Sequence, residues 1–229
     1  MRVLDVGSGA GDVAVLLASL VGPRGEVIGT DPARTAIDAA EKRIRASGLG
    51  NVRFQHGDPA LMTFDKPFDA VVGRYVLQFM PDPSGAVARL SNHLHRDGII
   101  FFHELDWTGA RSSPLAPTYE SVLGWIMRTI EGDGAQIRLG ARLGSVFERA
   151  GLSGPTLRLE SVIASAPAAI DAVHLVTDLV ATPLPNIERT GIANASEVEL
   201  PSLAQRILAE VGADGTLIGR AEIAAWTTV

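Results

Sequence analysis

A short apolar run that ends in a glycine-rich turn constrains this chain more than any other feature. Residues 2–12 read RVLDVGSGAGD, in which apolar residues precede the three glycines Gly7, Gly9 and Gly11. An apolar run cut off by glycines is typical of a strand buried on both faces of a parallel sheet. Apolar side chains then recur at helical spacing over residues 13–20. Strand, turn and helix in this order predict the ligand-binding corner of a doubly wound α/β fold.

Two carboxylates border this turn and indicate the charge of its ligand. A dinucleotide-binding turn reads G-x-G-x-x-G and presents backbone N–H groups to a pyrophosphate. Here the third glycine comes one place early, Asp12 stands where that pattern has Gly or Ala, and Asp5 precedes the turn. Two carboxylates would repel a pyrophosphate, whereas S-adenosylmethionine (SAM) carries a sulfonium and an α-ammonium and no phosphate. The simpler alternative is that Asp5 is a turn residue and that the glycines only tighten the connection.

The segment LDVGSGAG resembles the first motif of the class I, Rossmann-like SAM-dependent methyltransferases. Further segments resemble that family in the same order, namely an acid at Asp31, Gly-Asp at 57–58, the runs 71–83 and 101–107, and RLGSVFERAGL at 142–152. The resemblance implies a transferase that moves the methyl group of SAM to an oxygen, nitrogen or carbon nucleophile of a small molecule. It implies SAM as the cofactor, S-adenosylhomocysteine as its product, and no metal.

The resemblance also assigns a set of cofactor-binding residues. Asp31 ends the expected second strand, where a carboxylate accepts both ribose hydroxyls, although it could instead cap the next helix. Asp58 would accept the adenine amino group, although a turn aspartate before a proline is the alternative. The full set is Asp5, Gly7, Ser8, Gly9, Gly11, Asp31, Pro32, Asp58, Pro59, Arg74 and Tyr75.

Alternating strand and helix patterns define the expected fold class. They predict a doubly wound α/β domain over 1–229, with a seven-stranded, mostly parallel sheet whose last strand is antiparallel. Helical insertions at about 105–136 and 164–215 would cap the substrate side, since both leave from the carboxyl ends of strands. The expected strands are 2–6, 26–31, 51–55, 68–73, 99–102, 156–163 and 216–229, and helices are expected over 32–47 and 83–94 after the one at 13–20.

Side chains around the expected acceptor are less clearly indicated than those around the cofactor. His103 is the candidate general base by residue type, although the sequence favours a structural histidine bonded to a neighbouring strand. His93 and His95 should lie near the end of a surface helix, and no histidine spacing indicates a metal site. The candidate substrate pocket consists of Trp107, Tyr119, Trp125, Met127 and His174.

Composition and charge limit the kinds of partner that the chain is expected to bind. A net charge of −6 argues against a nucleic-acid surface, and no apolar run reaches the roughly 20 residues of a membrane span. The chain has no cysteine, which fits a cytoplasmic location. A second copy of the chain, in a homodimer, is the expected protein partner. Because the site begins almost at Met1, we expect it to be unusually open or covered by another subunit.

Two other functions compete with methyl transfer. One is an NAD-dependent oxidoreductase, which would want the same acid at Asp31 but is disfavoured by Asp12 and by the glycine spacing. The other is a catalytically degenerate protein that binds SAM without transferring its methyl group. A comparison of SAM and NAD binding distinguishes the oxidoreductase from the methyltransferase. A screen of methyl acceptors distinguishes the degenerate protein from an active enzyme.

Overall fold

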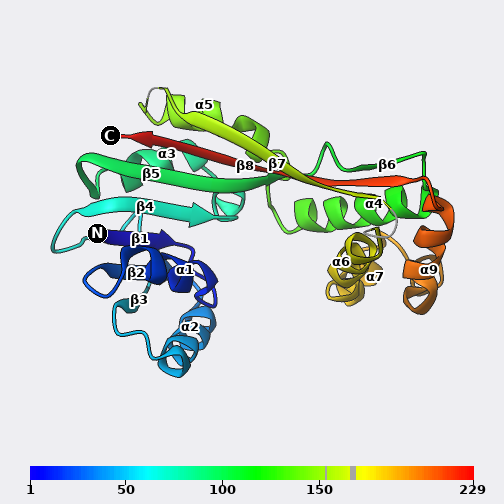
Figure 1. Ribbon diagram of the computed structural model, residues 1–229, viewed down its shortest axis with the longest axis horizontal. Coiled ribbons are helices and arrows are strands. Elements are labelled where there is room, and N and C mark those ends of the chain that lie inside the picture. The colour runs from blue at the N-terminus through cyan, green and yellow to red at the C-terminus, as the bar shows by residue number, and fades with distance from the viewer. Residues whose placement is uncertain (153, 166–168) are drawn as a thin grey trace. The chain divides into compact units, whose positions relative to one another are not determined.

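The chain forms two compact units in a computed structural model that describes residues 1–152, 154–165 and 169–229 (Figure 1). Unit 1 comprises Met1–Glu104, Leu139–Arg158 and Ile223–Val229, and unit 2 comprises Leu105–Arg138 and Leu159–Glu222. The expected insertions 105–136 and 164–215 fall within unit 2, apart from their residues 166–168, which lie outside the described part. That these insertions cap the substrate side stays a prediction.

The sheet has the predicted doubly wound, mostly parallel character. Its strand order is β3-β2-β1-β4-β5-β8-β6, and β7 pairs with β8. The neighbours from β3 to β5 are all parallel. Strand β8 is antiparallel to β5, because Val229 at its end exchanges backbone hydrogen bonds with Asp97 and Gly98 near the start of β5. The strands are β1 (Arg2–Val6), β2 (Glu26–Asp31), β3 (Val52–His56), β4 (Phe68–Arg74), β5 (Leu94–Asp106), β6 (Arg111–Ser113), β7 (Thr156–Ser165) and β8 (Thr216–Thr228).

The described part of the chain forms eight strands in place of the seven expected from the sequence. The additional strand, β6, contains only Arg-Ser-Ser and pairs antiparallel with the start of β8. Three polar residues carry no alternation and no β-branched or aromatic side chain, so nothing in the sequence marked them as a strand.

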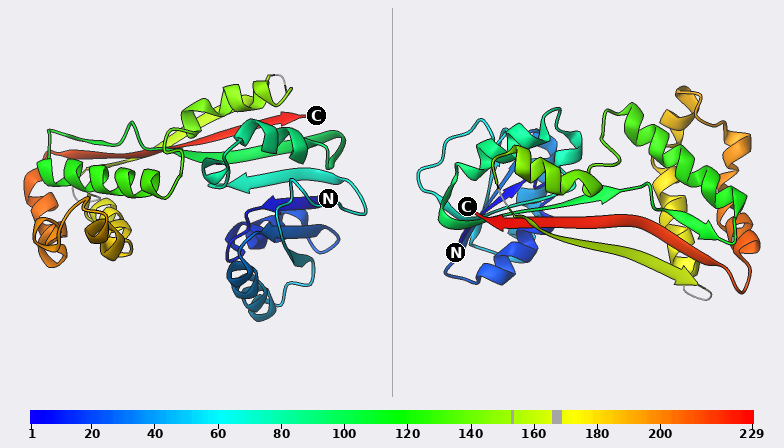
Figure 2. Two further views of the ribbon diagram at one scale, coloured as in Figure 1. Left: turned by 180° about the vertical axis from the view of Figure 1, so that it is seen from behind. Right: turned by 90° about the horizontal axis from the view of Figure 1, so that it is seen from above.

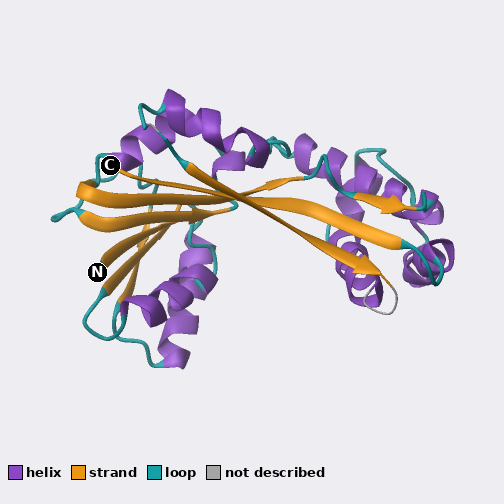
Figure 3. Ribbon diagram, turned by 45° about the horizontal axis from the view of Figure 1, so that its top comes forward, coloured by secondary structure: helices purple, strands orange, loops and turns teal. Residues whose placement is uncertain are grey.

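Helices of unit 1 pack on both sides of its strands (Figure 3). They are α1 (Asp12–Val21), α2 (Arg34–Ser47), α3 (Pro83–Ser91) and α5 (Leu143–Arg149), with single 3₁₀ turns at Leu77–Phe79 and Gly140–Arg142. Ala14 and Ala18 of α1 are buried with Val27 of β2, Ile44 of α2 and Val52 of β3. This core holds the α1 end of the glycine turn, and the buried Leu4 and Val6 of β1 hold its other end.

One predicted helix boundary is wrong. Helix α3 ends at Ser91, and Leu94 already belongs to β5, where it pairs with Phe68 of β4. Leu94 continues the apolar spacing of the helix, so the pattern alone could not show that a strand claims it. His93 therefore lies in a turn and His95 in β5, not at the end of a helix.

Unit 2 contains the remaining helices. They are α4 (Pro117–Gly132), α6 (Ala169–Ala181), α7 (Leu184–Arg189), α8 (Ala195–Val198) and α9 (Leu200–Val211). Helix α4 buries the apolar stripe formed by Tyr119, Val122, Leu123 and Ile126, and α6 and α9 contact α4 and each other (Figure 2). None of the described helices combines the length and apolar character needed to cross a bilayer.

Candidate functional site

Glycine is required at three positions of the β1–α1 turn. Gly7, Gly9 and Gly11 have φ values of 66°, 51° and 87°, in the left-handed region. A Cβ at Gly7 would also lie 2.5 Å from Cγ2 of Val76, and one at Gly11 would lie 3.1 Å from the Phe54 ring. A Cβ at Gly9 would meet no atom within 4 Å. The turn is thus packed at both ends and open in the middle, where a ligand can approach the backbone.

Asp31 ties this turn to the end of β2. Its Oδ2 accepts the backbone N–H of Gly9 at 3.0 Å, and its Oδ1 accepts the N–H of Ala33 at 2.8 Å. Helix α2 begins at Arg34 with Ala33 as its N-cap, so the alternative of Asp31 as the N-cap residue is wrong. Each carboxylate oxygen accepts one hydrogen bond and can accept another. The predicted ribose contact is therefore compatible with the bonds already made.

Asp5 is the buried acid of the site. It is 1% exposed, and its Oδ2 has no hydrogen-bond partner among the described residues. Burial, and secondly the nearby charge of Asp31, raise the pKa of Asp5 to about 7, while the donating backbone N–H of Ala14 lowers it. The hydroxyl of Ser8 is also buried, and no described residue forms a hydrogen bond with it. A buried carboxylate whose ionisation is opposed by a neighbouring carboxylate favours a ligand with positive charge.

Asp12 has a different role from the one inferred for it. It is exposed in the first turn of α1 and forms an ion pair with Arg43 of α2. Its charge is therefore already compensated within the protein. The carboxylate that would repel a pyrophosphate is therefore Asp5, because a nucleotide cofactor of either kind would use Asp31 for its ribose.

The loop after β3 contains the predicted adenine-binding residues. Asp58 is exposed, and its Oδ1 accepts the N–H of Ala60 at 2.9 Å, which is the turn role weighed against adenine binding. Pro59 is buried, and its carbonyl oxygen lies 2.8 Å from Nε2 of His93. His56 similarly lies 3.0 Å from the carbonyl oxygen of Pro32. These histidines hold the two loops in place, and Asp58 keeps capacity for a further hydrogen bond.

The segment after β4 brings Arg74, Tyr75 and His103 together. Tyr75 has a φ of 57°, and its backbone N–H donates to the carbonyl oxygen of His103 at 2.8 Å. The Arg74 guanidinium lies 4.4 Å from the Tyr75 ring centroid and donates to its hydroxyl at 3.0 Å. The rings of Tyr75 and His103 are 5.6 Å apart, and both residues are half-buried. His103 is thus partly accessible, as a general base would have to be.

Glu104 is a site residue to which the sequence assigned no role. It is fully buried, and Oε1 accepts the N–H groups of Val76 and Leu77 at 2.9 and 2.8 Å. Oε2 accepts the N–H of Gln78 at 3.4 Å. Burial raises the pKa of Glu104 to about 7, although these three donors lower it. The only signal was an acid that closely follows the apolar run at residues 99–102, next to the candidate base.

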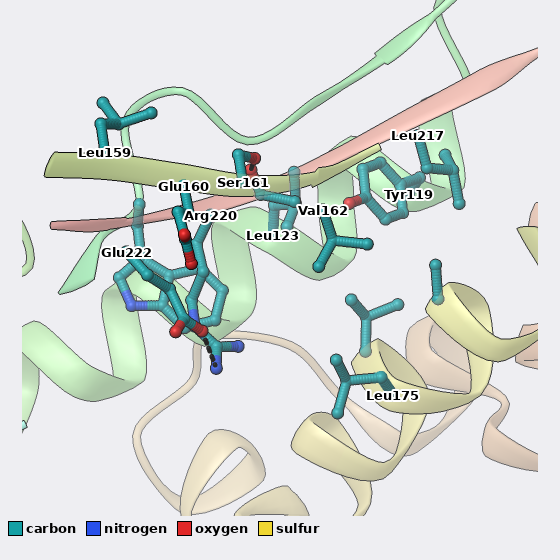
Figure 4. Close-up of a pocket in the computed structure, with 14 residues that line it drawn as sticks. Tyr119, Leu123, Leu159, Glu160, Ser161, Val162, Leu175, Leu217, Arg220 and Glu222 are labelled. Carbon is teal, nitrogen blue, oxygen red and sulfur yellow. Dashed lines mark hydrogen bonds and ion pairs between the residues drawn. The ribbon is translucent and has the colours of Figure 1, made fainter. Parts of the chain in front are cut away.

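Two of the five predicted substrate-pocket residues lie together. Trp107 and Tyr119 line a cavity of about 630 Å³ within unit 2 (Figure 4). Trp125 is buried, Met127 is half-buried and His174 is exposed, and none of the three lines this cavity. In the described part of the chain, no group of three or more His, Cys, Asp or Glu side chains could hold a metal ion.

Comparison with known proteins identifies the family. The demethylmenaquinone methyltransferase of Geobacillus kaustophilus is 42% identical over 82 residues, which cover 35% of each chain. The aklanonic acid methyltransferase DauC of Streptomyces sp. (strain C5) is 38% identical over 102 residues, which cover 44% of this chain and 46% of the relative. The chain thus matches less than half the length of these curated relatives.

Similarity of fold extends over nearly the whole chain. The crystal structure of the YcgJ protein from Bacillus subtilis superposes with a TM-score of 0.60, covering 98% of this chain and 90% of that one at 19% identity. A family model described as a methyltransferase domain matches residues 1–151, which include the glycine turn, Asp31, Asp58, Tyr75 and His103. The chain therefore belongs to the methyltransferase domain family.

Proposed function

We propose that the chain transfers the methyl group of SAM to a small-molecule acceptor, using the turn between β1 and α1 as its cofactor site. The observation that carries this proposal is the buried carboxylate of Asp5 near Asp31 at the glycine turn, where burial, and secondly the charge of Asp31, raise the pKa of Asp5 to about 7. A sulfonium and an ammonium would relieve this repulsion, whereas a pyrophosphate would increase it. Membership of the methyltransferase domain family supports the same ligand.

The residues present fit the cofactor. Asp31 would accept the ribose hydroxyls with the lone pairs left by Gly9 and Ala33. Asp58 and Pro59 would bind the adenine. The Ser8 hydroxyl, which has no hydrogen-bond partner among the described residues, would form a hydrogen bond with the cofactor. Arg74 and Tyr75 would border the methionyl part. When bound, SAM supplies a methyl group already activated by its sulfonium, so positioning of the acceptor is the main task of the protein.

His103 is the proposed base where the acceptor must lose a proton. Its ring stacks obliquely on Tyr75, which keeps the imidazole at a defined position at the end of β5. Curated relatives are named for demethylmenaquinone and aklanonic acid, which supports a small organic acceptor. Net charge of −6 supports a site that does not bind nucleic acid, and the absence of cysteine supports a cytoplasmic location, with a homodimer as the proposed assembly.

Ligand binding followed by turnover tests this function. Calorimetric titration of the full chain with SAM, S-adenosylhomocysteine and NAD⁺ should show binding of the first two only. Methyl transfer from radiolabelled SAM should then appear with at least one member of a panel of quinols, phenols and amines. Preferential NAD⁺ binding would favour the oxidoreductase, and SAM binding with no transfer to any panel member would favour the degenerate protein.

A further inference from the structure

Unit 2 contains a cavity whose walls are mostly apolar. Strand β7, helices α4 and α6, and the part of β8 in unit 2 surround about 630 Å³. The apolar lining includes Leu123, Leu159, Val162, Leu175 and Leu217. Leu159, Val162 and Leu175 are between 52% and 65% exposed, so they present apolar surface to the cavity instead of filling a core. A cavity of this size with an apolar wall and a few polar groups has the features of a small-molecule site.

Polar groups gather at one end of this cavity. Figure 4 shows Arg220, Glu222 and Glu160 together at the end opposite to Tyr119 and Leu217. The Arg220 guanidinium lies 3.5 Å from Glu222 and 5.1 Å above the Trp107 ring. A ligand with one polar end and one apolar end would therefore bind in a single orientation.

Two buried donors at this end have no partner. Nε of Arg220 and Nε1 of Trp107 are buried and make no hydrogen bond among the described residues. Trp107 is only 3% exposed. Both groups are donors with no acceptor capacity, and buried donors in proteins are nearly always paired. A small shift of the Arg220 side chain would bring its Nε–H to an oxygen atom of a ligand in the cavity.

The charged side chains that line the cavity determine whether a neutral or an anionic ligand oxygen can bind there. One guanidinium faces two carboxylates, Glu160 and Glu222, so the polar end has no surplus positive charge for an anion. We propose that this cavity binds a neutral, largely apolar small molecule through a carbonyl oxygen that accepts from Arg220. That this molecule is the methyl acceptor rests on the proposed function, whereas its binding does not.

Three probes of one size test the ligand chemistry. 2-Acetylnaphthalene carries a carbonyl, 2-isopropenylnaphthalene replaces that oxygen by a CH₂ group, and 2-naphthoate replaces the acetyl group by an anion. Calorimetry on the full chain without SAM should give the ketone roughly 3- to 10-fold tighter binding than the alkene, as one hydrogen bond provides. The naphthoate should bind no more tightly than the ketone. Equal binding of ketone and alkene, or tighter binding of the naphthoate, would overturn the proposal.

Two neighbouring residues of β7 supply a matched pair of variants. Val162 lines the cavity and is 65% exposed, whereas Ile163 is 69% exposed and does not line it. Val162→Lys should abolish binding of the ketone and Ile163→Lys should leave it unchanged, while both proteins keep the wild-type circular dichroism spectrum. Arg220→Met should remove the preference of the ketone over the alkene. Equal effects of the two lysine variants would contradict the location.

Titration with SAM separates this inference from the proposed function. Probe binding without SAM binding would leave the cavity assigned and refute the cofactor site. SAM binding without probe binding would refute the cavity and leave methyl transfer standing.

Discussion

Oε1 of Glu104 accepts the backbone N–H of Leu77 at 2.8 Å. The same carboxylate accepts from Val76 and Gln78, so the end of β5 holds the beginning of the single 3₁₀ turn that follows β4. This turn comes directly after Arg74 and Tyr75, which are proposed to border the methionyl group. Glu104 is thereby a positioning residue, because it orders backbone next to the site without facing the ligand itself.

Stability should fall with rising pH partly because of Glu104. Its pKa is raised from 4.5 to about 7, so between these values the folded protein keeps a proton that the unfolded chain has lost. Folding therefore becomes less favourable as the pH rises through this window, by at most about 1.4 kcal/mol per pH unit for one group. Glu104→Gln should flatten this dependence in urea unfolding measured from pH 5 to 8.

An exposed glutamate of α5 gives the control for that measurement. Glu148→Gln should change the free energy of unfolding by less than about 0.5 kcal/mol at any one pH. If Glu104→Gln retains the full wild-type pH dependence, Glu104 does not hold the proton.

Binding of SAM should release protons from Asp5. Burial and Asp31 raise its pKa to about 7 in the free protein, and an adjacent positive charge would lower it. At pH 7, calorimetry in buffers of different ionisation enthalpy should show release of roughly half a proton per SAM bound. Asp5→Asn should abolish this release. A wild-type enthalpy that is independent of the buffer would show that the cation does not reach Asp5.

Replacement of Gly9 by alanine should have two effects that can be measured separately: a loss of stability from backbone strain and a loss of SAM affinity from steric overlap with the ligand. Gly9 and Gly48 both have positive φ values, 51° and 69°, and a Cβ at either would meet no atom within 4 Å. Alanine at either site should cost about 1–2 kcal/mol of stability because of the left-handed backbone. Only Gly9→Ala should weaken SAM binding, by about tenfold or more, since its methyl group would occupy ligand space. Equal SAM affinity of the two variants, by calorimetry, would contradict the position of the cofactor.

Local patterns were enough to predict the first half of the fold. Short runs that end near glycine or an acid predicted strands β1 to β4 within about a residue at each end. The signal is strong in β1, β2 and β4, because their side chains are largely buried in a parallel sheet. The start of β5 and the short strand β6 were missed. Both depend on pairing with distant strands, as when Leu94 pairs with Phe68, and no local periodicity records that pairing.

Site residues could be predicted from the sequence where the backbone conformation or a single ligand group requires one residue type. The glycines of the turn and Asp31 are such residues. Glu104 does not, because its three donors come from a segment that is remote in sequence. Trp125 is the opposite case, a residue predicted to line the substrate pocket that does not line the cavity. It shares a helix with Tyr119, but it is buried away from the cavity that Tyr119 lines, and sequence spacing could not indicate which face of α4 meets the cavity.

Asp31 should dominate the affinity for SAM. Its carboxylate would accept the ribose hydroxyls, and hydrogen bonds to a charged group contribute about 1.5–3 kcal/mol, so Asp31→Ala should raise the Kd by roughly 10- to 150-fold. Asp12→Ala removes an acid from the same turn that is paired with Arg43 at the surface, and such a pair contributes less than about 1 kcal/mol to stability. Calorimetry should therefore find near wild-type SAM affinity for Asp12→Ala. Unchanged affinity of Asp31→Ala would refute the ribose assignment.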